Sequence, residues 1–177
     1  MAENRVDPTV AGLFLIGFIT LVFGIAGIQM FNEGFGVSAL LDAANVLVLP
    51  VAFIILIFAY MAGKAGNAFA VALFAFIAVA LFGAGVLMNG EPLLFAIIAF
   101  FFIIYAIVAL LIGAPKLLVI LLFLVALLFL FIGFAFAVNS GGEAGAYCLV
   151  FGIFGLLSFI VATYMAVALA TQKAPVF

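Results

Sequence analysis

Histidine is absent from this chain, cysteine occurs only at Cys148, and the 177 residues include just four Lys or Arg and six Asp or Glu. The single cysteine excludes an internal disulfide and a cysteine cluster for a metal. Because the chain has no histidine and no carboxylate lies well inside the long apolar stretches, neither Cys148 nor Ser158 has a base to activate it as a nucleophile. We therefore predict that the chain is not an enzyme and that it holds no cofactor or metal.

The scarcity of charge also excludes a soluble domain. Soluble domains carry roughly 25% charged residues, whereas here the charged fraction is 6% and the hydrophobic fraction is 73%. The chain has no run of basic residues, so we predict that it does not bind nucleic acid. Ionisable groups are also missing from the interiors of the apolar stretches, where proton relays and ion-coupled pumps carry theirs. Any proton that crosses the membrane with a solute must therefore travel on water or on the solute.

What the chain does contain is a series of long apolar stretches separated by short polar breaks. Each stretch is close to the ~20 residues that an α-helix needs to cross a bilayer. The stretches cover residues 9–31, 41–63, 67–88, 93–113, 117–138 and 146–170. We predict an all-α integral membrane protein with six transmembrane helices in one compact bundle. In this prediction residues 1–8 are a cytoplasmic segment, 9–170 the transmembrane domain, and 171–177 a cytoplasmic tail.

The few charges are divided between the two ends of the predicted bundle. Lys and Arg occur only near the chain termini and in the second and fourth connections, at Arg5, Lys64, Lys116 and Lys173. The other three connections carry acidic residues instead, at Glu33, Asp42, Glu91 and Glu143. Because cytoplasmic segments are enriched in Lys and Arg, both termini are predicted to be cytoplasmic. The expected location is the plasma membrane, which the chain crosses several times.

Small residues recur at helical spacing on three stretches, and such stripes permit close helix packing in lipid. In the last stretch they share one face, at Cys148, Gly152, Gly155, Ser158, Ala162, Ala166 and Ala170. The first stretch carries Gly17, Thr20, Gly24 and Gly27, and the third carries Ala68, Ala72, Ala75, Val79 and Gly83. We interpret the stripes as packing faces within one protomer. The alternative is that a stripe lines a narrow path or an interface between protomers.

Gly66 and Asn67 open the third stretch, just after Lys64. Asn is a favourable N-cap, so one interpretation is a helix cap behind a flexible glycine. The other is that the N–H groups exposed at this helix start, together with Lys64, form a mouth that attracts anions. Both roles stay open on the sequence alone.

Three segments resemble the acetate uptake transporters, also called succinate-acetate permeases. Asp7-Pro8-Thr9-Val10-Ala11-Gly12-Leu13 resembles that family's signature Asn-Pro-Ala-Pro-Leu-Gly-Leu, with Asp7 and Val10 as departures. Gly66-Asn67-Ala68-Phe69 is similar to its Gly-Asn-Thr-Phe turn. The last stretch is similar to the family's closing Gly-rich and Ala-Tyr-x-Ala pattern, through Gly152, Ala162, Tyr164, Ala166 and Ala168.

The resemblance implies a homohexamer in which each protomer has its own pathway for small monocarboxylates, often with proton coupling. It also implies a hydrophobic constriction midway along the path, and alignment near the motifs places its residues at Ile16, Ile77 and Leu124. We assign Thr20 as a hydroxyl on the path. The mouth and signature positions are Asp7, Pro8, Gly12, Leu13, Gly66, Asn67 and Phe69.

The function predicted from these observations is a channel or transporter for a small monocarboxylate such as acetate, linked to protons through protonation of the substrate. Its expected partners are this solute, the lipid bilayer and further copies of the chain. Two rival functions fit the same uncharged stretches. One is a channel for a small neutral solute such as urea, a short amide or ammonia, and the other is an assembly subunit that transports nothing.

Overall fold

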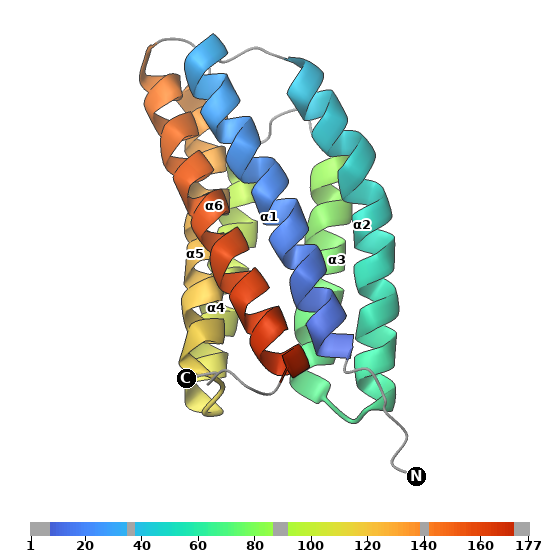
Figure 1. Cartoon of the computed structure of the whole chain (residues 1–177). Helices are drawn as coiled ribbons and strands as arrows, with labels where there is room; N and C mark the ends of the chain where they lie inside the picture. Colours follow the sequence, from blue (N-terminus) through green and yellow to red (C-terminus); the bar gives the residue numbers. More distant parts are fainter. Residues whose placement is uncertain (1–7, 35–37, 87–91, 139–141, 172–177) are drawn as a thin grey trace.

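The computed structural model describes residues 8–34, 38–86, 92–138 and 142–171, and the elements within these ranges are α-helices (Figure 1). The helices are α1 (Pro8–Glu33), α2 (Ser38–Lys64), α3 (Ala68–Val86), α4 (Pro92–Leu111), α5 (Lys116–Val138) and α6 (Gly142–Thr171). Each predicted stretch therefore has its helix, and the all-α fold is confirmed. Met88, the predicted end of the third stretch, lies outside the described residues.

Length and composition are those of a membrane bundle. Five of the helices contain a segment that is long and apolar enough to span a bilayer, and α3 is a shorter apolar helix over Ala68–Gly83. Large apolar side chains face outward, among them Phe53 and Phe100 at 60% exposure and Leu111 at 80%. A contiguous apolar surface of this kind needs lipid or protein against it rather than water. The chain is an integral membrane protein that crosses the bilayer several times.

Two of the turns are built on a glycine in the left-handed backbone region. Gly66 has φ +78° and Gly113 has φ +70°. At each turn the glycine N–H bonds the carbonyl three residues back, and the next N–H bonds the carbonyl five residues back, which is the Schellman helix end. The sequence placed the end of the fourth stretch at Gly113, but α4 ends at Leu111 because this motif has already turned the chain.

The six helices form a closed ring. α1 packs closely along α6 and also contacts α2, α2 packs along α3, and α5 lies between α4 and α6. The contact between α3 and α4 closes the ring, and it is the least extensive contact between neighbouring helices. α1 begins and α6 ends at the same end of the bundle (Figure 1), as an even number of crossings requires. We call this end, which also carries Lys64 and Lys116, the lysine end.

The small residues of α1 and α6 pack against each other. A Cβ atom added at Gly155 would lie 2.6 Å from the backbone nitrogen of Gly24, and one at Gly27 would lie 2.6 Å from the carbonyl oxygen of Cys148. Only glycine permits so close an approach of two backbones. Packing within the protomer, the interpretation made from the sequence, is confirmed for the α1 stripe and for the α6 stripe as far as Ala166, whereas Ala170 is exposed.

The same interpretation is wrong for much of the α3 stripe. Ala68, Ala72 and Val79 are exposed on the outside of the bundle. A Cβ at Gly83 would have no atom within 4 Å. The reason is geometric: α3 turns its larger residues, such as Leu73 and Ile77, toward the inside of the ring, so its small residues face outward.

Candidate permeation path

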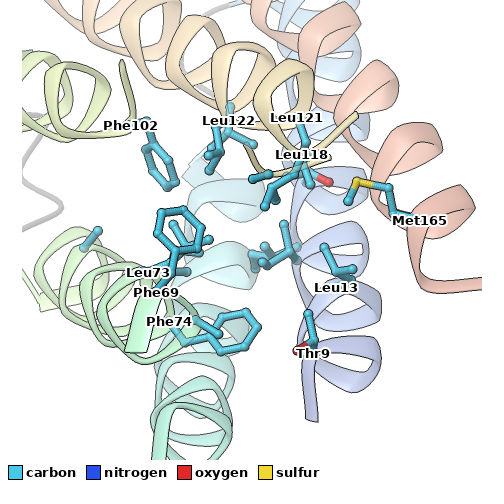
Figure 2. Close-up of a pocket in the computed structure, with 18 of the residues that line it drawn as sticks. Thr9, Leu13, Phe69, Leu73, Phe74, Phe102, Leu118, Leu121, Leu122 and Met165 are labelled. Atoms are coloured by element: carbon cyan, nitrogen blue, oxygen red, sulfur yellow. The ribbon is translucent and has the colours of Figure 1, made fainter. Parts of the chain in front are cut away.

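A central cavity of about 340 Å³ lies inside the ring of helices. Side chains from α1, α3, α4, α5 and α6 line it, whereas no described residue of α2 does so. Figure 2 shows side chains from these helices pointing into one common space, including Leu13, Leu73, Phe102, Leu121 and Met165. α2 therefore acts as an outer support that holds α1 beside α3.

The mouth of the central cavity lies at the lysine end. Thr9 at the start of α1, Asn67 before α3 and Pro115 before α5 line it, so three helix N-termini meet there. Helix N-termini carry partial positive charge and unpaired N–H groups. The Oδ1 atom of Asn67 accepts a hydrogen bond of 3.0 Å from the backbone N–H of Ala70. The N-cap role of Asn67 is thus confirmed, and its side chain also borders the cavity.

The cavity reaches past the middle of the bundle. Its lining follows α1 from Thr9 to Phe23, a distance of about 21 Å at the helical rise of about 1.5 Å per residue. Thr20 is 2% exposed and donates a hydrogen bond of 2.9 Å to the carbonyl oxygen of Gly17. Since a hydroxyl has one proton and two lone pairs, the Thr20 oxygen can still accept a hydrogen bond but has no proton left to donate.

Aromatic rings close the inner end of the cavity. Phe23, Phe102 and Phe129 belong to the lining and come from α1, α4 and α5. The ring of Phe129 lies 6.0 Å from that of Phe23 and 5.7 Å from that of Phe102, between ring centres. Phe95 stacks on the other side of Phe129, at 6.4 Å. We call these four residues the aromatic layer; sequence reasoning missed them, because nothing in their spacing separates them from the other phenylalanines.

Side chains rather than backbone contact seal the ring between α3 and α4. The hydroxyl of Tyr105 in α4 donates a hydrogen bond of 3.1 Å to the carbonyl oxygen of Ala72 in α3. The ring of Phe76 lies 5.3 Å from that of Tyr105 and 5.2 Å from that of Phe102. This seam separates the central cavity from the outer surface at the weakest helix contact.

The structure brings together two of the three predicted constriction residues. Ile16 and Ile77 line the central cavity, each 6% exposed. Leu124 does not line it and is only partly buried, so the predicted register of α5 is wrong at this point. Leu121 and Val125 of the same helix face the cavity instead. The role of any of these residues as a constriction stays a prediction.

The described signature positions lie around the mouth. Leu13, Asn67 and Phe69 line the cavity. Pro8 begins α1, Gly66 forms the turn before α3, and Asp7 lies outside the described residues. Gly12 has a packing role that the sequence does not reveal: the ring of Phe74 lies directly against it, where a Cβ atom would overlap. The glycine therefore leaves room for the Phe74 ring of α3 to pack against α1 near the mouth.

Comparison with known proteins decides the fold. No protein-family model matches the chain, and no curated protein matches it by sequence. Among solved structures, the bacterial acetate channel SatP superposes with a TM-score of 0.72, covering 98% of this chain and 100% of that one at 16% identity. This chain has the acetate-channel fold. The resemblance noted in the sequence is confirmed at the level of the fold, which is as far as 16% identity reaches.

Proposed function

We propose that this protein is a membrane channel or transporter for a small monocarboxylate such as acetate. The observation that carries the proposal is an apolar cavity running from the lysine end past the bundle middle, in the fold of an acetate channel. A path inside each protomer agrees with the ring of helices around this cavity. Hexamer formation and the plasma membrane location are further parts of the proposal; the hexamer rests on the family resemblance.

The solute crosses the apolar part of the path as the neutral acid. Burying a bare carboxylate without compensation is prohibitive, and the described lining contains no Lys or Arg. The oxygen of Thr20 can accept a hydrogen bond but not donate one, so it suits the O–H of a neutral acid better than a carboxylate. Proton linkage in this mechanism is carried by the substrate, whose carboxyl pKa is about 4.

The mouth concentrates the anion before it takes up a proton. Three helix N-termini, with Lys64 and Lys116 on the same end, contribute positive potential that attracts the anion. This is the anion-attracting role that the sequence left open for Asn67, now beside its role as a cap. Beyond the mouth, Ile16, Ile77 and the aromatic layer form a hydrophobic barrier that admits solute by size and by brief wetting.

A channel for a small neutral solute is the second candidate, because the described lining carries no charged side chain. Uptake of isotope-labelled acetate into proteoliposomes, with and without an inward proton gradient, tests the first candidate. Acetate uptake above protein-free liposomes that rises with the gradient supports it. Uptake of urea alone would favour the second, and absence of any solute flux would favour an assembly subunit.

A further inference from the structure

The central cavity is much larger than acetate requires. A buried apolar cavity of about 150 Å³ is sufficient to bind benzene, which has six heavy atoms, whereas acetate has four. The cavity here measures about 340 Å³. On that scale it has room for a solute with about twice as many heavy atoms as benzene.

The lining is also suited to a hydrocarbon chain. Leu13, Leu73, Leu121 and Leu122 face one another across the cavity beyond the mouth (Figure 2). The one buried polar side chain in the described lining is Thr20, whose proton is already bonded to Gly17. Such a space does not stabilise ordered water, because an ordered water molecule needs two to four polar partners. If acetate alone occupied the cavity, most side chains in the cavity wall would have no atoms to pack against on the side that faces the cavity.

We propose that the central cavity is a binding site for an unbranched monocarboxylic acid of about six to ten carbons, a size set by the cavity volume. The carboxyl group lies at the mouth beside Asn67, and the chain extends inward along Leu13 and Leu73 toward the aromatic layer. The inference rests on the proposed function, since such an acid occupies the path assigned to acetate and competes with it.

Each added methylene that leaves water for this cavity strengthens binding by about fourfold. The gain ends when the acid has filled the cavity of about 340 Å³, because further carbons have no apolar volume left to fill. Partition into the bilayer has no such limit. A break in the dependence on chain length therefore separates a site of fixed volume from membrane partition.

The test is exchange of labelled acetate across proteoliposomes at equal pH on both sides, inhibited by acids from acetate to dodecanoate. We expect the half-inhibitory concentration to fall by about fourfold per methylene and to level off near decanoate. A half-inhibitory concentration that does not depend on chain length would overturn the proposal. So would a half-inhibitory concentration that keeps falling at the same rate through dodecanoate.

Two variants on α3 refine the test. Ala80 lines the cavity at 6% exposure and Val79, its neighbour, faces outward at 69% exposure. Ala80→Phe fills part of the inner cavity and should raise the half-inhibitory concentration of decanoate by about fifteenfold, the value of two methylenes at about fourfold each. Val79→Phe should leave it unchanged. Equal inhibition of both variants would contradict the proposed site. If Ala80→Phe does not fold, the dependence of inhibition on chain length in the unmodified protein still tests the proposal.

Failure of the proposed function gives a different result. If acetate exchange does not exceed that of protein-free liposomes, acetate transport is wrong, and the cavity is then tested by thermal unfolding in lipid nanodiscs with octanoate. A rise in Tm with octanoate that exceeds the rise with acetate supports the binding site. Equal Tm values with the two acids would overturn it.

Discussion

Thr20 combines burial with a hydrogen bond that leaves its oxygen only as an acceptor. Its hydroxyl is committed to the carbonyl of Gly17, within the same helix. A neutral acid can donate its O–H to that oxygen, whereas a carboxylate has nothing to donate. One side chain thereby favours the neutral form of the solute without carrying any charge.

Replacing Thr20 by Val keeps the shape of the side chain and removes the acceptor. We expect the initial rate of acetate uptake to fall by about fivefold, since one hydrogen bond is worth about 1 kcal/mol. Thr20→Ser is the matched control and should retain the rate. An unchanged rate in Thr20→Val would remove the hydroxyl from the mechanism.

The lining of α5 makes a second prediction at this scale. Leu121 faces the central cavity and Leu124 does not. If hydrophobic bulk limits passage, Leu121→Ala should raise acetate flux by about severalfold and admit larger solutes. Leu124→Ala is the control and should change neither. Liposome swelling with acetate and propionate measures both effects, and a larger effect at Leu124 would restore the register predicted from the sequence.

At the scale of elements, the α1–α6 pair is the closest helix contact in the ring. Gly24 and Gly155 meet backbone to backbone, and the gain from such contacts in lipid is van der Waals packing rather than the hydrophobic effect. A side chain larger than hydrogen at either position must separate the helices. The pair thus fixes the position of one wall of the central cavity.

Gly155→Leu should therefore destabilise the protein by about 1–3 kcal/mol or more, as overpacking does. The expected result is a lower thermal midpoint and a smaller yield of monodisperse protein on detergent chromatography. Gly83→Leu is the matched control, because a Cβ at Gly83 meets no atom within 4 Å. Equal midpoints for the two variants would show that the α1–α6 contact tolerates separation.

At the scale of the whole molecule, the orientation in the membrane follows from Lys64 and Lys116 at one end. We predict that this end, and with it both termini, is cytoplasmic. In a Cys148→Ala background, a thiol reagent that cannot cross membranes should label Cys introduced at Gly90 or Gly142 on intact cells. Cys introduced at Ala65 or Ala174 should stay unlabelled; labelling of these two alone would reverse the orientation.

The pH dependence of transport also belongs to the whole molecule. Since the described cavity lining carries no charged side chain, acetate uptake should rise as external pH falls toward the acid pKa of about 4. A neutral solute of similar size should show little dependence on pH. Parallel uptake measurements across external pH decide this. Equally steep profiles for both solutes would mean that protonation of the protein opens the path.

Much of this fold was predictable because its determinants are local. A bilayer requires helices of about 20 apolar residues whose backbone groups are satisfied internally, and the polar breaks mark where they end. Gly66 and Asn67 could be read as a turn and a cap because a left-handed glycine and a side-chain acceptor are needed there whatever the rest of the chain does. The small-residue stripes of α1 and α6 indicated close helix contact for the same reason.

The lining of the cavity was decided only by the tertiary structure. In lipid, a helix can be apolar on every side, so no amphipathic stripe marks the face that turns inward. For this reason the sequence did not distinguish Leu121 from Leu124, and it did not separate the four residues of the aromatic layer from the rest of the 24 phenylalanines. The ring of helices places Phe23, Phe102 and Phe129 together, because residues from three separate helices meet only after those helices have packed.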